Sequence, residues 1–233
     1  MRSLSLLLAA CLVGCASGVA EAPVGYKLGF TSSAAQQRFG VSSPAWGVLR
    51  RGMRVPAGGA VAAGSFSRVF VEAEIAFTIG RRLDVPLERP SELLSFVRSV
   101  HPALELPDWR FAPGAQPSFE EIVADGVGAH LFVLGPGRDP GSVELEAARV
   151  ALERDGQEIA RGRGADALGS PWRALLWLNR ALVAEGAALE PGDIVLTGAL
   201  GPVSAFSPGE AAGRYRVAVE GLGSVALTIT AGH

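Results

Sequence analysis

The chain has 233 residues, a hydrophobic content of 48% and a formal net charge of -2. This composition is typical of one globular domain of ordinary size, and it excludes a disordered chain, which lacks the apolar residues needed for a core. With 21 basic and 23 acidic side chains there is no basic excess, so we expect no nucleic-acid partner.

The first residues are predicted to be a targeting segment. "MRSLSLLLAACLVGC" carries a positive charge at Arg2 and an apolar run that is too short to span a bilayer. The run ends in "LVGC", which resembles a bacterial lipobox, so we expect a lipoprotein signal peptide over 1–14, lipidation of Cys15 and a tether over 15–23. Cys11 is a second candidate for lipidation, and a buried first helix of the domain is the alternative interpretation.

Both cysteines of the chain lie in this segment, so a mature protein that begins at Cys15 has no disulfide. We therefore expect a protein of the bacterial cell envelope, periplasmic or on the outer surface, which contacts the membrane through its N-terminal lipid. A cytoplasmic protein is the alternative if the gene start is misassigned.

Residues 24–233 are predicted to form one domain, in which frequent glycine and proline favour strands and turns. In chain order, we expect strands at 24–30, 46–52 and 67–79, a helix at 91–100 capped by Ser91, and a strand at 103–106. Beyond these, we expect a short helix at the capping box of Ser118 and Glu121, a strand at 130–135 and a hairpin at 149–162 that turns at Asp155-Gly156. The last expected elements are a helix at 170–186, a strand at 192–200 and two strands within 214–230. The fold class is therefore α+β, dominated by strands.

The strand "RVFVEAEIAFTIG" carries an unusual pair of charges. Because strand side chains alternate between two faces, Glu72 and Glu74 share one face, about 7 Å apart at the backbone. Two like charges at this range repel each other unless a cation neutralises them, and hard divalent cations such as Mg²⁺ or Mn²⁺ prefer carboxylate oxygens. Glu105 also interrupts an apolar strand and is the candidate third ligand. The alternative is a solvated strand face, since E-x-E is common in strands.

Other catalytic motifs are absent from the sequence, which has no glycine-rich phosphate loop, no GxSxG elbow and no HExxH. The segments around the glutamates instead resemble the fumarylacetoacetate hydrolase superfamily, in its branch of 2-keto-4-pentenoate hydratases and 4-oxalocrotonate decarboxylases. The matching motifs are "VGYKLGFTS", "WGVL", "VEAEIAF", "ALELPDWR", "IVADG", "FVLG", "LGSPWRALLWLNRAL", "PGDIVLTGAL" and "GLGSVAL". They lie in this order over about residues 24 to 230. The resemblance implies a mixed β-sheet roll with a few flanking helices, and a homo-oligomer as a possible assembly.

The resemblance also implies a metal centre for a small 2-oxo acid. Glu72, Glu74 and Glu105 match the carboxylates that bind Mg²⁺ or Mn²⁺ in the family. A 2-oxo acid chelates such a metal through its carboxylate and its C2 oxygen, and the metal stabilises the enolate. In the hydratases a 2-hydroxydienoate then ketonises and adds water, and in the decarboxylases CO₂ departs from the same enolate.

Three further residues are implied beside the substrate. Lys27 matches a lysine of the family that lies next to it, where it would donate a proton or hold the carboxylate as a point charge. A surface lysine is the alternative on the sequence alone. Thr197 and Gly198 match the rim of the pocket, where hydroxyl and backbone groups meet the substrate carboxylate.

Two departures from the family pattern leave alternatives open. Family members carry a helical segment before the "GYKLGFTS" motif, and we expect the domain at 24–233 to lack it. Acidic residues after the "GxL" motif, one of which is considered catalytic, are replaced here by Arg50, Arg51 and Gly52. An arginine cannot act as a base, so a catalytically weakened lipoprotein that binds metal and 2-oxo acid is an alternative to the hydratase. A decarboxylase on the same scaffold is the third.

Overall fold

A computed structural model describes residues 22–231 of the chain. The predicted signal peptide, Cys15 and all but the last two residues of the predicted tether lie outside this range. Within the described range, no helix combines the length and the apolar composition that crossing a bilayer requires.

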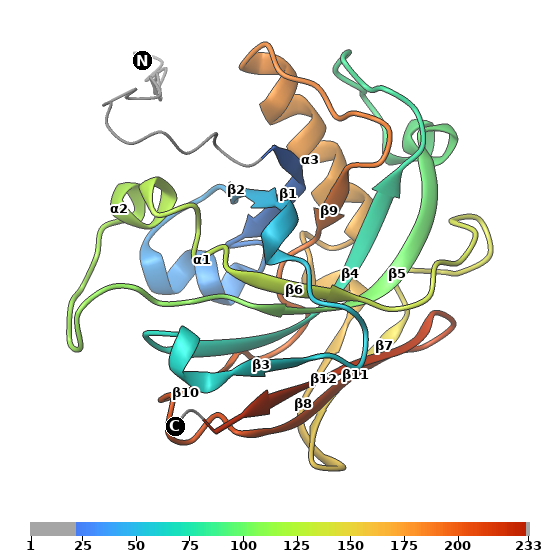
Figure 1. Cartoon of the computed structure of the whole chain (residues 1–233). Coiled ribbons are helices and arrows are strands. Elements are labelled where there is room, and N and C mark those ends of the chain that lie inside the picture. The colour runs from blue at the N-terminus through green and yellow to red at the C-terminus, as the bar shows by residue number, and fades with distance from the viewer. Residues whose placement is uncertain (1–21, 232–233) are drawn as a thin grey trace.

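Two β-sheets form the body of the fold (Figure 1). The larger sheet has seven strands in the order β2-β1-β9-β4-β5-β6, with β10 paired to β4. These strands are β1 (Pro23–Gly29), β2 (Ala45–Arg50), β4 (Val69–Ile79), β5 (Val97–Leu106), β6 (Leu131–Leu134), β9 (Ile194–Leu196) and β10 (Ser204–Phe206). In this sheet β1 and β9 run parallel, and the other neighbours are antiparallel.

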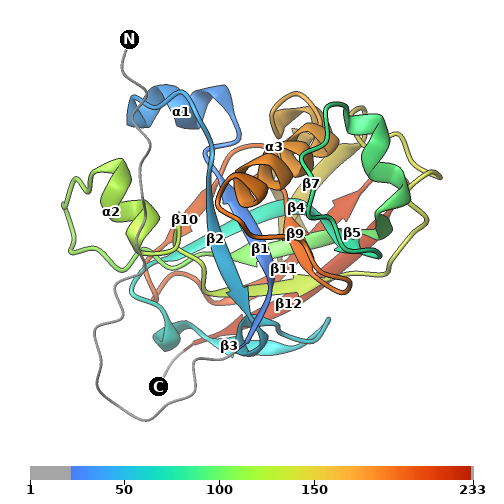
Figure 2. The ribbon, with the colours of Figure 1, turned by 90° about the horizontal axis from the view of Figure 1, so that it is seen from above.

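The smaller sheet has five strands in the order β3-β12-β11-β7-β8, and it lies below the larger sheet in Figure 1. Its strands are β3 (Ala60–Ala62), β7 (Arg149–Arg154), β8 (Gln157–Arg163), β11 (Gly213–Val219) and β12 (Gly223–Thr230). The α-helices are α1 (Ser33–Phe39), α2 (Phe119–Ala124) and α3 (Pro171–Ala184), and short 3₁₀ helices cover Arg51–Met53, Ala63–Ser65, Pro90–Ser95 and Gly164–Asp166. In Figure 2, α2 lies on the opposite side of β1 and β2 from α3. The strand-rich α+β class is confirmed.

The main hydrophobic core lies between one face of the larger sheet, the smaller sheet and α3. Alternate residues of β4, such as Ile75 and Phe77, point into this core and are fully buried. Phe77 packs on Trp172 of α3, with ring centroids 4.8 Å apart. The buried face of α3 also carries Asn179, whose amide bonds the backbone at residues 85 and 87 and so secures the long connection after β4.

A second cluster lies on the opposite face of the larger sheet, and its side chains are small or aliphatic apart from one phenylalanine. Its buried members are Leu49, Ala76, Ala103, Phe132, Leu134, Ile194 and Leu196. By strand alternation, Glu74 lies next to Ala76 on this face of β4, and Glu105 lies next to Ala103 on the same face of β5. Glu74 and Glu105 therefore continue a row of buried apolar side chains and do not lie on a solvated strand face, and Glu72, next on this face of β4, is partly buried.

The helix expected at 91–100 is a wrong prediction. A 3₁₀ helix covers Pro90–Ser95, with Arg89 rather than Ser91 at its N-cap, and β5 begins at Val97. Val97 and Val100 pair with Ile79 and Phe77 of β4. Apolar residues at this spacing fit both a helix and a strand, and pairing with a long central strand decides the outcome.

Local turn chemistry is confirmed at two places. Ser118 and Glu121 form the capping box of α2, and Asp155-Gly156 joins β7 to β8 with φ angles of 52° and 82°. Both residues at positive φ match the twist that a two-residue hairpin requires. Helix α1, strand β3 and strand β10 were not anticipated, because each is short.

Candidate metal centre

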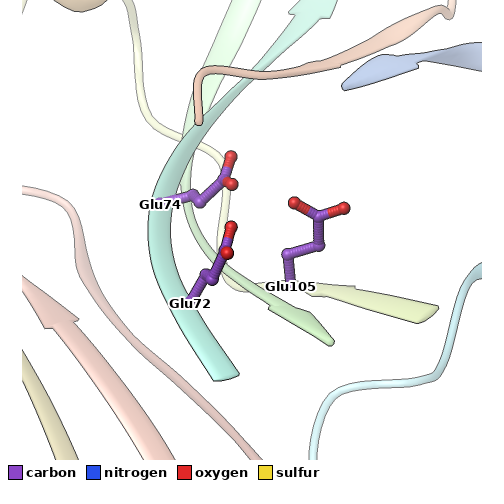
Figure 3. A group of neighbouring side chains, drawn as sticks. All are labelled: Glu72, Glu74 and Glu105. Atoms are coloured by element: carbon purple, nitrogen blue, oxygen red, sulfur yellow. The ribbon is translucent and has the colours of Figure 1, made fainter. Parts of the chain in front are cut away.

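Strand register brings the three predicted glutamates together. Glu72 and Glu74 share one face of β4, and Glu72 is the direct partner of Glu105 across the antiparallel β4–β5 ladder. A carboxylate oxygen from each residue lies within 4.8 Å of the others. Figure 3 shows Glu72 and Glu74 projecting from the same side of the curved β4, with Glu105 beside them.

Two of these carboxylates are buried and lack the partners that buried charges need, whereas Glu72 is only partly buried. Glu74 is 0% exposed and Glu105 is 1% exposed. Oε2 of Glu74 accepts a hydrogen bond from the backbone N–H of Gly198 at 2.9 Å, but among residues 22–231 its Oε1 has no hydrogen-bond partner. Neither oxygen of Glu105 has a hydrogen bond from this part of the chain, and Oε1 has only an ion pair with Lys27. Orphaned buried oxygens of this kind are what a bound cation satisfies.

Lys27 completes the charged group from β1. Its side chain is buried, its Nζ lies 3.0 Å from Oε1 of Glu105, and it donates a hydrogen bond to the carbonyl of Val127 at 3.1 Å. It is the only lysine in a chain with 20 arginines. An ammonium can release a proton inside a protein, whereas a guanidinium cannot. Lys27, which is buried against Glu105, is therefore a cation suited to proton transfer.

The pKa values show how strongly these groups interact without a metal. Burial raises the pKa of Glu72 to about 7, which Lys27 opposes and Glu105 reinforces. Burial and the neighbouring carboxylates also raise the pKa of Glu74 well above its ordinary range. Burial lowers the pKa of Lys27, but the three carboxylates outweigh burial, so the net shift is upward.

Charge arithmetic favours a divalent ion. Three carboxylates and one ammonium sum to a charge of about -2 when all are ionised. A divalent cation neutralises that sum, and oxygen-only ligands suit hard ions such as Mg²⁺, Mn²⁺ and Ca²⁺. The residues present therefore fit a divalent metal.

Thr197 and Gly198 lie at the end of β9 beside Glu74. The hydroxyl of Thr197 donates to the carbonyl of Ile75 at 2.9 Å, so its proton is already used to hold β9 against β4. Gly198 has φ of 90°, and a Cβ placed on it would lie 2.3 Å from Oγ1 of Thr31. The backbone at Gly198 can thus approach both Glu74 and the hydroxyl of Thr31. Thr31 belongs to the "GFTS" segment, one of the motifs that carry the resemblance to the family. Binding of substrate by Thr197 and Gly198 stays a prediction.

The residues that replace the family's acidic pair lie away from this cluster. Lys27 pairs with Gly47 of β2, and Arg51 is four residues further along, about 13 Å in an extended strand. Arg51 and Gly52 are exposed in the 3₁₀ turn after β2. Arg50 alternates with Leu49, which belongs to the cluster on the site face, so Arg50 points to the other face. The replacement therefore adds no arginine to the carboxylate cluster.

Comparison with known proteins supports the geometry. Residues 25–230 match the family model described as fumarylacetoacetate (FAA) hydrolase C-terminal. The chain is 40% identical over 204 residues to 2-keto-4-pentenoate hydratase 2 of Dechloromonas aromatica, covering 87% of this chain and 76% of the relative. Among solved structures, 4-oxalocrotonate decarboxylase of Pseudomonas putida G7, complexed with magnesium and adipate, superposes with a TM-score of 0.84 at 26% identity, covering 90% of this chain and 79% of that one. The same decarboxylase complexed with calcium and acetate gives a TM-score of 0.82 at 27% identity, with coverage of 90% and 78%.

Proposed function

The chain belongs to the fumarylacetoacetate hydrolase family, and from this premise we propose that it is a divalent-metal-dependent lyase of the 2-keto-4-pentenoate hydratase type. Its substrate would be a short 2-hydroxydienoate, and its product a 4-hydroxy-2-oxo acid. The observation that carries the proposal is the largely buried cluster of Glu72, Glu74 and Glu105 with the only lysine of the chain. A hydratase of this type needs both a metal for the 2-oxo acid and a group that moves a proton.

Glu72, Glu74 and Glu105 would hold the metal, for which we propose Mg²⁺ or Mn²⁺. When bound, this ion supplies Lewis-acid chemistry that stabilises negative charge on the C2 oxygen of a 2-oxo acid. The N–H of Gly198 fixes Oε2 of Glu74, so the remaining oxygen of that carboxylate is oriented toward the site. A backbone donor of this kind orients a ligand in the way second-shell groups usually do.

Lys27 would carry the proton at its Nζ. Conversion of a 2-hydroxy-2,4-dienoate to its 2-oxo form moves one proton from the C2 hydroxyl to C5, and water then adds its hydroxyl to C4 and its proton to C3. An ammonium can give a proton to carbon and regain one from the hydroxyl, so no net proton is consumed. The negative charge of Glu105 keeps this amine protonated before the reaction, against the opposing effect of burial, and burial excludes bulk water from it.

Two other functions use the same residues. Decarboxylation of a 2-oxo acid with a second acidic group is favoured by the match to 4-oxalocrotonate decarboxylase at a TM-score of 0.84. Binding without turnover rests on the replacement of the family's acidic residues at 50–52. The exposed position of Arg51 and Gly52 weakens this second alternative, since the charged cluster itself is intact.

The test is turnover by the purified full chain with Mg²⁺ or Mn²⁺. We expect loss of the dienoate absorbance with 2-hydroxypenta-2,4-dienoate, and little CO₂ release from 4-oxalocrotonate. Glu74→Gln should abolish turnover, because it removes one charge from the cluster. Lys27→Arg keeps the positive charge but cannot release a proton, so an active Lys27→Arg enzyme would show that residue 27 acts only as a point charge. Metal binding without turnover of either compound would exclude the enzymatic function.

We also propose that the protein is exported and anchored through a lipidated Cys15 in the bacterial cell envelope. The "LVGC" sequence after a charged and apolar start supports this proposal. Mass spectrometry of the N-terminus should find diacylated Cys15, and Cys15→Ser should abolish lipidation while leaving Cys11 in place. An unprocessed Met1 in a bacterial host would refute it.

A further inference from the structure

The turn after α2 contains three consecutive residues in the left-handed region. The φ angles of Gly126, Val127 and Gly128 are 73°, 57° and 71°. Glycine adopts such angles freely, but valine is β-branched and is a genuine outlier there. A strained residue of this kind persists only where the surrounding structure holds it in place.

The surrounding contacts hold Val127 firmly. Its backbone N–H donates to Ile122 at 2.9 Å, and the carbonyl of Gly128 accepts from the N–H of Asp108 at 3.0 Å. The side chain of Val127 is 8% exposed and lies against Gly29 of β1, where an added Cβ would come within 2.4 Å of its Cγ1. The turn therefore packs directly on the strand that carries Lys27, and only a glycine at position 29 allows so close an approach.

This turn presents one atom to the site. The carbonyl oxygen of Val127 accepts a hydrogen bond from Nζ of Lys27, and Oε1 of Glu105 lies 3.0 Å from the same nitrogen. These two acceptors come from separate elements and fix the direction of the ammonium. An ammonium has three N–H groups, so one remains for a substrate.

We infer that Val127 is a positioning residue, whose strained backbone aims the proton of Lys27 into the carboxylate cluster. This inference rests on the proposed hydratase function. Misplacement of a reacting group by about 1 Å lowers the rate by about 100-fold without removing binding contacts. Displacement of the Val127 carbonyl should therefore lower kcat and leave KM and Mg²⁺ affinity almost unchanged.

A pair of variants tests this geometry. Gly29→Ala places a methyl group against Cγ1 of Val127, so the Val127 side chain must shift, and we expect its turn to shift with it. With Val127→Ala added, the nearest remaining side-chain atom of residue 127 is its Cβ, at 3.9 Å from the new methyl, so the double variant accommodates it. We expect Gly29→Ala to lower kcat by about 10- to 100-fold, with KM and Mg²⁺ affinity within about twofold, and the double variant to recover most of the loss.

A spectroscopic measurement observes the contact directly. Because Lys27 is the only lysine, protein labelled with ¹⁵N at the lysine side chain gives a single ammonium signal. In the Mg²⁺-loaded wild type and in the double variant we expect protection of this ammonium from exchange with water, and in Gly29→Ala we expect that protection to be lost. If Gly29→Ala fails to fold, Val127→Gly serves instead. Glycine adopts the same φ without strain but also many other angles, so the turn no longer fixes the position of the carbonyl at residue 127. Val127→Gly should lower kcat by about 10-fold at unchanged KM.

The outcomes separate the two proposals. A wild-type protein without turnover overturns the proposed function. A wild type with turnover, together with unchanged kcat in the variant that folds, overturns the positioning role alone. Equal losses of kcat in Gly29→Ala and the double variant also overturn it, because relief of the clash should restore the carbonyl. Loss of kcat with matching loss of ammonium protection, both reversed in the double variant, supports it.

Discussion

Each sheet has a pair of charged residues directly opposite each other across an antiparallel ladder, and the two pairs differ in the signs of their charges. Glu72 of β4 lies opposite Glu105 of β5 in the larger sheet, and Arg216 of β11 lies opposite Glu153 of β7 in the smaller one. Opposite charges in such positions stabilise an antiparallel sheet, whereas like charges destabilise it. The smaller sheet thus has the arrangement that favours stability, and the larger sheet has the arrangement that opposes it.

Burial increases the contrast. The side chains of Arg216 and Glu153 are 38% and 28% exposed, and they form an ion pair at 3.1 Å that water also solvates. Glu105 is almost fully buried, with one ion pair for two oxygens. A fold keeps such a costly arrangement only if something else compensates it, and a divalent cation is the compensation that we propose here. The proposed metal centre thus lies where the charge pattern departs from what the fold alone requires.

The largest expected effect comes from the same isosteric change at the two glutamates. Glu105→Gln should lower Mg²⁺ affinity by at least about 100-fold, because it removes a charged ligand and frees Lys27 from its partner. Glu153→Gln should leave the affinity within about twofold. Isothermal titration calorimetry measures both, with a circular dichroism melt to show that each variant is folded. Equal affinities in the two variants would refute the metal centre.

The second effect is stabilisation of the whole protein by metal. At a free Mg²⁺ concentration 100 times the Kd, binding adds about 2.7 kcal/mol to the free energy of unfolding. For a chain of this size that corresponds to a rise in Tm of about 5–10 °C, which EDTA should reverse. The rise should persist in Glu153→Gln and disappear in Glu105→Gln. No shift in wild type at millimolar Mg²⁺ or Mn²⁺ would contradict the prediction.

The third effect is a dependence of stability on pH in the metal-free protein. Burial raises the pKa of Glu72 to about 7 from its ordinary value of 4.5, so the folded state binds this proton more tightly than the unfolded state does. The stabilising contribution of that proton is complete below about pH 4.5 and is lost as the pH rises through about 7. The loss should be on the order of 3 kcal/mol.

Chemical denaturation in EDTA at pH 5 and pH 8 measures this loss, and the difference between wild type and Glu72→Gln reports the part of it that depends on the charge of residue 72. Mg²⁺ requires ionised carboxylates, so the stabilisation that it provides should instead grow over the same pH range. A wild type that gains more stability than Glu72→Gln between pH 5 and pH 8 without metal would contradict the assignment.

Much of this site could be predicted from the sequence, because strand alternation places Glu72 and Glu74 on one face whatever the fold. The partnership with Glu105 is different. It depends on the register between β4 and β5, which spacing does not specify. The sequence offered Glu105 as a candidate because it interrupts an apolar strand, and the resemblance to a family then implied that it joins the other two glutamates. The wrong helix at 91–100 has the same origin, since the pairing of Val100 with Phe77 is a tertiary contact.

The backbone of Val127 could not be predicted from side-chain chemistry, because its functional atom is a carbonyl oxygen. The signal available was the spacing of glycines on either side of it, in "DGVG", which is typical of a turn with positive φ angles. That signal indicates a left-handed backbone, but it does not indicate that the carbonyl faces Lys27. Contacts of this kind are set by how a turn packs on a distant strand.

The smallest effect is expected in the smaller sheet itself. Glu153→Gln and Arg216→Ala remove a half-exposed ion pair, and such pairs contribute about 0.2–1 kcal/mol. The free energy of unfolding lost in the double variant should not exceed the sum of the losses in the two single variants. Water solvates the partner that remains in each single variant, so neither single change leaves a buried unpaired charge. Urea denaturation at low and high salt measures this difference, and salt should reduce it. A loss of several kcal/mol, or a loss that 1 M NaCl does not reduce, would contradict this prediction. It would show that Glu153 and Arg216 depend on each other as strongly as the buried glutamates depend on a cation, and the contrast between the two sheets would not hold.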